Sequence, residues 1–159
     1  MNRKVQIARL SVASNSLLII MKLLAGVISG SVSIISEAIH SSMDLVASII
    51  AFFSVKVSDN PPDSGHPYGH GKIENISGVI EAVLIFIAAI WIIFEAIRKL
   101  TGEPYEIQSM GVGSAVMLIS AIVNFFVSRM LYKVARETNS VALEAVSYTH
   151  LTLPTILLV

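Results

Sequence analysis

The sequence predicts an all-α protein, a polytopic membrane helix bundle. Three observations lead to this fold class. Of the 159 residues, 54% are hydrophobic and only 14% are charged, whereas soluble domains carry about 25% charged residues. The mean hydropathy is +0.76. Several apolar runs also reach the roughly 20 residues that a helix needs to cross a bilayer. We therefore expect about four complete spans and the start of a fifth.

The composition also narrows the possible chemistry. The chain has no cysteine, so disulfides and thiolate metal sites are excluded, and His, Asp and Glu remain as possible metal ligands. A formal net charge of zero gives no reason to expect a nucleic-acid partner. Arg3 and Lys4 precede the first apolar run, as in a signal peptide. That run is too long, and a second one follows at once, so we expect a retained helix.

Complete spans are expected at residues 7–28, 32–57, 75–97 and 109–133. The first two are separated only by Ser29-Gly30-Ser31, which predicts a tight helical hairpin. Residues 58–74 form a polar loop, because three prolines and three glycines exclude a regular helix there. A fifth helix is expected to begin near Thr138-Asn139, either of which can cap it, and to run through Ala145. Pro154 is expected to break or kink it.

His40 and Asp44 stand out within the second apolar run. Four residues apart, they lie on one face of a helix. A carboxylate inside a membrane-length segment is costly and marks an ion pathway or a buried pair. Imidazole and carboxylate together suit a divalent metal such as zinc. The alternative is a structural bundle in which the two side chains hydrogen-bond to each other. Nearby Glu37 is an outer ligand, a proton acceptor or a partner for Lys22.

The polar loop contains a second possible metal site, with the pattern Asp63-x-x-His66-x-x-x-His70. These three side chains converge on one ion if the loop turns back on itself. Two imidazoles and a carboxylate would supply three ligands and leave a fourth position for water or another group. The alternative is that the histidines are merely exposed to solvent.

The distribution of basic residues predicts the orientation of the chain. With the N-terminus inside, the inner segments hold eight Lys and Arg residues, and the outer turns hold only Arg98 and Lys99. The inner ones are Arg3, Lys4, Arg9, Lys56, Lys72, Arg129, Lys133 and Arg136. Short cytoplasmic segments carry an excess of positive charge. We therefore expect the N-terminus and the His66/His70 loop in the cytoplasm, with the protein in the plasma membrane.

These residues resemble those of the cation diffusion facilitator family of divalent-metal exporters. The resemblance rests on Gly30-Ser31, on the His40/Asp44 pair and on the loop string from Asp63 to Glu74, and it covers about residues 5–145. It implies a six-helix membrane domain, a cytosolic metal-sensing domain after it, a homodimer, and metal export coupled to proton entry.

The resemblance also implies roles for the five candidate residues. His40 and Asp44 match the part of the transport site that the second helix supplies, and Asp63, His66 and His70 match a metal site in the inner loop.

In the family, the fifth helix supplies the rest of the transport site as a His or Asp pair four residues apart. Counted from Leu143-Glu144-Ala145, those positions are Thr149 and Leu153, which do not ligate zinc. His150 is one residue away, a rotation of about 100° around the helix. We therefore expect residues 1–145 to be an incomplete membrane domain of cation-efflux type. Residues 146–159 are expected to be a non-native tail, with the cytosolic C-terminal domain absent.

The expected function is efflux of a divalent cation in exchange for protons. Zinc is the first candidate, with Fe²⁺, Mn²⁺, Co²⁺ and Cd²⁺ left open; no prosthetic group is expected, and membrane lipid and a second copy of the chain are the expected partners. The alternative is a non-transporting membrane subunit, or a metal-sensing dimer partner, with a half-built transport site. An enzyme is the least favoured class, because the sequence has no nucleophile–base arrangement, phosphate loop or cofactor motif.

Overall fold

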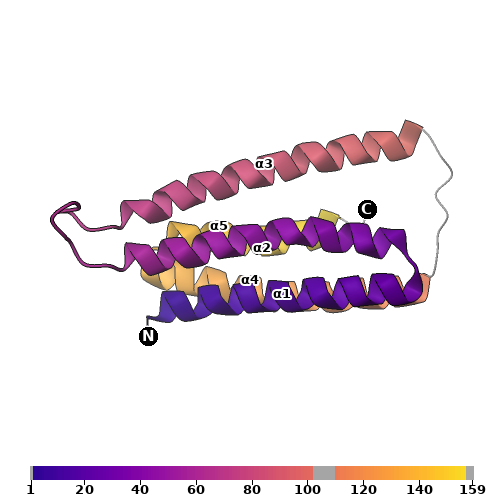
Figure 1. The fold of residues 1–159 in the computed structure, drawn as a ribbon, viewed down its shortest axis with the longest axis horizontal. Helices are drawn as coiled ribbons and strands as arrows, with labels where there is room; N and C mark the ends of the chain where they lie inside the picture. The colour runs from indigo at the N-terminus through magenta and orange to yellow at the C-terminus, as the bar shows by residue number, and fades with distance from the viewer. Residues whose placement is uncertain (1, 102–109, 157–159) are drawn as a thin grey trace.

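The computed structural model describes residues 2–101 and 110–156, and these residues form helices joined by short connections (Figure 1). The helices are α1 (Arg3–Ser29), α2 (Val32–Ser58), α3 (Lys72–Thr101), α4 (Met110–Thr138) and α5 (Val141–Ile156). The described residues contain no strand, which confirms the predicted all-α class.

The five helices lie side by side with their long axes roughly aligned (Figure 1). Helix α1 packs on α2 and α4, and α5 packs on α4, α2 and α3. Helix α3 lies at the edge of the bundle and packs on α2 and α5. The loop between α2 and α3 lies at the same end of the bundle as the N-terminus (Figure 1), and we call this end the loop end.

Four segments are long and apolar enough to cross a membrane: Arg3–Ser29, Ile34–Ser58, Lys72–Phe94 and Gly113–Thr138. Their outward faces carry large apolar side chains such as Leu17, Ile28, Phe86 and Trp91, which are 55% or more exposed in the isolated chain. Such faces are suited to lipid, which is as apolar as these side chains are. The predicted four spans and additional fifth helix are thus confirmed.

The α1–α2 hairpin forms where the sequence predicts it. Gly30 adopts a left-handed conformation with φ of 67°, which glycine adopts without steric cost. The backbone N–H of Ser31 then donates to the carbonyl of Gly26 at 3.1 Å, which gives a hydrogen-bond partner to one of the last carbonyls of α1. A Cβ at Gly26 would lie 2.6 Å from Ile35 Cγ1, so the two helices approach closely only because this residue is glycine.

A core of buried apolar residues lies toward the loop end and is built from α1, α2, α4 and α5. Its members include Ala8, Val55, Leu131, Leu143 and Val146, all nearly inaccessible to solvent. Several of the contributing side chains are alanine, and small residues let membrane helices pack closely.

A buried carboxylate joins four helices at the same end. Glu74, in the first turn of α3, accepts hydrogen bonds at Oε1 from Lys4 Nζ at 3.0 Å and from Ser58 Oγ at 2.7 Å. Ser140, just before α5, donates to Glu74 Oε2. Glu74 therefore ties α1, α2 and the start of α5 to α3.

The helix boundaries differ from prediction at α3. The helix begins at Lys72, so Glu74 belongs to it and not to the loop. The backbone N–H groups of Ile73 and Glu74 already donate to the carbonyls of His70 and Gly71, which starts the helix earlier than the glycines suggested.

The predicted cap and end of α5 were also wrong. Helix α4 extends to Thr138, and Asn139 ends it in a left-handed conformation with φ of 51°. Ser140 then precedes the first turn of α5 and accepts the backbone N–H of Glu144 at its carbonyl. Helix α5 continues past Ala145 to Ile156. Pro154 lies near its end, where a missing N–H removes only one of the backbone hydrogen bonds.

We predict that Glu74→Ala lowers the stability of the bundle by about 2 kcal/mol, because it removes hydrogen bonds to a charged, buried group. Thermal unfolding in detergent measures the effect. The control is Glu137→Ala, which removes an ion pair with Arg3 whose side chains are 62% and 39% exposed; an exposed pair contributes about 1 kcal/mol at most. Equal melting temperatures for the two variants would contradict the role of Glu74 in joining α1, α2 and the start of α5 to α3.

Candidate metal centre

The loop between α2 and α3 folds back on itself around Asp63. Asp63 Oδ1 accepts the backbone N–H groups of Gly65 at 2.9 Å and His66 at 2.7 Å, the pattern by which an aspartate closes a turn on its own backbone. Gly69 has φ of 79°, and its N–H donates to the carbonyl of His66 at 2.9 Å. This second reversal brings His70 back toward Asp63.

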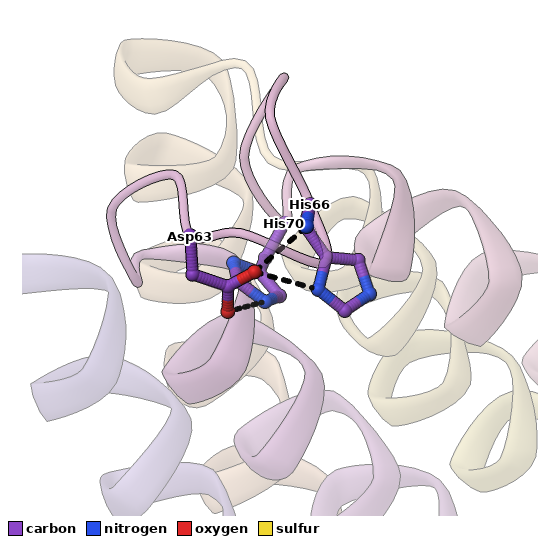
Figure 2. A group of neighbouring side chains, drawn as sticks. All are labelled: Asp63, His66 and His70. Atoms are coloured by element: carbon purple, nitrogen blue, oxygen red, sulfur yellow. Dashed lines mark hydrogen bonds and ion pairs between the residues drawn. The ribbon is translucent and has the colours of Figure 1, made fainter.

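As a result, the side chains of Asp63, His66 and His70 converge (Figure 2). His66 Nδ1 lies 3.2 Å from Asp63 Oδ1, and His70 Nε2 lies 3.4 Å from Asp63 Oδ2. One ligand atom from each residue lies within 4.8 Å of the other two. Ligand atoms on one tetrahedral zinc lie about 3.4 Å apart, so the spacing of the three side chains is close to what one ion would require.

The electrostatics of the loop favour a cation. The backbone N–H of His66 donates to Asp63 and, with that of Gly65, holds the pKa of this exposed carboxyl below its ordinary value. Asp63 is therefore ionised at neutral pH. The His70 side chain is only 10% exposed, whereas those of His66 and Asp63 are 60% and 54% exposed. The three-residue site is anchored on one side and open to solvent on the other.

The membrane pair of α2 has a different environment. Asp44 is 5% exposed and lies on the inward face of α2, and its Oδ1 atom is buried with no hydrogen-bond partner among the described residues. His40, one turn earlier, is partly buried. No hydrogen bond joins the two side chains in the part of the chain that the structure describes. Asp44 therefore retains an unused acceptor inside the bundle.

Lys22 lies close to this pair and is itself 4% exposed. Its Nζ donates to Glu37 Oε1 at 2.8 Å and to Ser41 Oγ at 2.6 Å. Of the three roles that the sequence leaves open for Glu37, the structure gives it the partnership with Lys22. This ion pair joins α1 to α2 on the side of Asp44 away from the loop end.

A second buried polar network links α1, α2, α4 and α5 through His150. The Nδ1 atom donates to Asn124 Oδ1 at 3.2 Å, and Nε2 lies 2.7 Å from Ser11 Oγ. Ser48 Oγ lies 2.9 Å from Ser11 Oγ and accepts from Asn15 Nδ2 at 2.7 Å. Both ring nitrogens are thus occupied by polar partners.

Sequence reasoning treated His150 only as a displaced ligand and missed this network. Two signals pointed to it: Ser11 and Asn15 lie four residues apart within one span, and Asn124 lies inside another. Thr149, at one of the expected ligand positions, is 5% exposed and donates to the carbonyl of Ala145 at 3.3 Å. The side chain of Leu153 lies outside those that the structure describes.

The family-level comparison agrees with this arrangement. A model described as the cation efflux transmembrane domain matches residues 8–158. The chain belongs to the cation efflux family. It is therefore an integral membrane protein of a family of transporters that move metal cations.

Curated relatives support the same assignment. The chain is 32% identical to the manganese efflux system protein MneP of Bacillus subtilis over 145 residues. This alignment covers 91% of this chain and 48% of MneP. The chain is 34% identical over 146 residues to the cation-efflux pump FieF of Yersinia pestis, covering 90% of this chain and 48% of FieF. The magnetosome protein MamB of Paramagnetospirillum magneticum is 36% identical over 122 residues, covering 76% of this chain and 40% of MamB. The chain spans about half the length of the curated relatives it matches.

We predict that Asp63→Asn weakens zinc binding at the loop at least tenfold without unfolding the loop. Asparagine retains the oxygen that accepts the two backbone N–H groups but lacks the charge that a divalent cation prefers. Calorimetric titration with zinc measures the affinity. Asp59→Asn, at the end of α2 and outside the three-residue site, is the matched control. Equal affinity in the Asp63 variant and the control would rule out Asp63 as a ligand.

Proposed function

We propose that the complete protein exports a divalent metal cation across a membrane in exchange for protons. The observation that carries this proposal is the unpartnered Asp44 Oδ1 inside the bundle, one helical turn from His40. A buried carboxylate oxygen without a partner is energetically costly, and a bound cation relieves that cost. Membership of the cation efflux family favours transport over a purely structural role for the pair.

Competition between metal and protons supplies the exchange. A metal ion binds neutral imidazole and ionised carboxylate, so binding at His40 and Asp44 releases protons, and protonation releases the metal. Protons that arrive from outside displace the cation, and cations that arrive from inside displace protons. Export also requires the bundle to expose the site to one side at a time, as other transporters do by rocking their helices.

Zinc is the first candidate for the exported cation. Imidazole combined with carboxylate suits zinc better than calcium or magnesium, which prefer oxygen ligands. The name of one relative, a manganese efflux system protein, keeps manganese as the leading alternative. Iron, cobalt and cadmium remain further candidates for the same flux assay.

We place the N-terminus and the loop end on the cytoplasmic side of the membrane, on the basis of the distribution of basic residues. We propose the plasma membrane as the membrane that holds the protein. The loop residues Asp63, His66 and His70 then bind a metal ion on the side from which the cargo arrives. We also propose that the complete protein acts as a homodimer in the lipid bilayer.

Residues 146–159 are proposed to be a non-native continuation of the chain. The support is chemical, since Thr149 and Leu153 stand where the resemblance places metal ligands. Against it, the family model matches through residue 158, and Val146 and His150 pack inside the bundle. Sequencing the source DNA across codons 140–159 and beyond tests this. A helix with a His or Asp pair four residues apart, followed by a sixth span, is the expected result. If the tail is encoded as given, the chain has a half-built site, and a non-transporting subunit or metal-sensing dimer partner becomes the better proposal.

We predict that Asp44→Asn in the complete protein abolishes zinc flux into proteoliposomes while the protein still inserts and remains folded. Asparagine retains the size of the side chain and loses the charge that binds the cation. Asp59→Asn serves as the control and is expected to transport normally. Undiminished flux in the Asp44 variant would refute the assignment of the transport site.

A further inference from the structure

Glu81 is a second carboxylate buried inside the bundle, on α3. It is 0% exposed. Both of its carboxylate oxygens are buried without a hydrogen-bond partner among the described residues. Buried polar groups in proteins are nearly always hydrogen-bonded, so a carboxylate with two unpartnered oxygens requires an explanation.

A hydrogen bond between α2 and α3 indicates the depth of Glu81. Ser77 Oγ donates to Ser54 Oγ at 2.9 Å and so aligns the two antiparallel helices. At about 1.5 Å per residue, Glu81 lies about 6 Å beyond Ser77, and Asp44 about 15 Å beyond Ser54, in the same direction. Glu81 is therefore closer to the loop end than Asp44 by about 9 Å along the helices.

The face of α3 that turns inward forms a polar stripe that leads to Glu81. Glu74, Ser77 and Glu81 are all buried and follow one another at helical spacing, whereas the side chains between them, such as Ile76 and Ile80, are exposed. The stripe begins at the loop end with Glu74 and ends at Glu81, part-way toward the depth of Asp44.

Among the described residues, no charged group forms an ion pair with Glu81. Helix α2 carries His40 and Asp44 farther from the loop end than Glu81, and an exposed Lys56 nearer to it. Helix α5 carries Glu144, Tyr148 and His150. Helix α3 itself carries Glu74, and its Lys72 and Arg98, near its two ends, are exposed. Lys4, a cation toward the loop end, is already paired with Glu74 at 3.0 Å. An isolated ionised carboxylate in an apolar interior is so costly that the group takes up a proton instead.

We propose that Glu81 holds a proton in the metal-free protein and gives it up to the loop end when a cation enters the bundle. This inference rests on the proposed metal/proton exchange. In the step, the O–H bond of the Glu81 carboxyl breaks, the proton passes to water at the loop end, and the carboxylate left behind is stabilised by the positive charge of the entering divalent cation. When the cation leaves, a proton from the opposite side restores the carboxyl.

Infrared spectroscopy of the complete, reconstituted protein without metal tests whether Glu81 is protonated. We expect a carbonyl stretching band of a protonated carboxyl at neutral pH that is lost in Glu81→Gln. Glutamine matches the neutral acid in size, so the fold is retained. Glu137→Gln, which alters an exposed carboxylate, is the control and keeps the band. The variant Asp44→Asn shows whether Asp44 also contributes to this infrared band. Superimposable spectra for the parent protein and Glu81→Gln would overturn the proposal.

Proton release on zinc binding tests whether that proton takes part in exchange. In weakly buffered solution with a pH indicator, we expect Glu81→Gln to release about one proton fewer per zinc ion than the parent. Glu81→Asp restores the release. An unchanged proton count with the infrared band lost would show that the proton is held permanently, which overturns its role in exchange. If the parent protein transports no zinc into proteoliposomes, the proposed function fails. The infrared experiment then still decides by itself whether Glu81 is protonated.

Discussion

A charge inside an apolar bundle is stable only with a partner, and this constraint organises the interior of the protein. Lys22 is held by Glu37 and Ser41, and Glu74 is held by Lys4, Ser58 and Ser140. Both arrangements join different helices, so the requirement for a partner also fixes which helices lie together. Removing one partner of such a pair strongly destabilises the folded protein, because the other charge stays buried without compensation.

Against this background, Asp44 and Glu81 are exceptions that share one property. Each has a buried carboxylate oxygen without a hydrogen-bond partner in the described chain. A structural pair would have been satisfied in the way that Lys22 and Glu37 are. Unsatisfied acids inside a membrane bundle are typical of groups that bind something transient, such as a cation or a proton.

Much of the fold was predictable, because length and hydropathy determine where a chain can cross a membrane. The hairpin at Gly30 was also predictable, since only three residues separate two apolar runs. The capping of α5 was not, because Thr138, Asn139 and Ser140 are all good caps, and only the left-handed conformation of Asn139 selects Ser140.

The candidate site was predictable only in part. The spacing of Asp63, His66 and His70 indicated a cluster, and the turn at Asp63 with the reversal at Gly69 brings them together. The partners of the Lys22, Glu81 and His150 side chains depend on which helices pack against these residues. The sequence does not contain that information in any local pattern.

Among the described residues, the side-chain hydrogen bonds that join α3 to other helices lie at its loop end. Glu74 and Ser77 bind α2 and the start of α5, and a Cβ at Gly78 would lie 3.0 Å from Val141 Cγ1. Beyond Glu81, the inward face of α3 offers apolar residues such as Leu84 and Ala88, whose helix contacts can be exchanged for lipid at little cost. A tilt of α3 about its loop end would therefore break few polar contacts among the described residues, because the hydrogen bonds that join α3 to other helices lie beside the loop between α2 and α3.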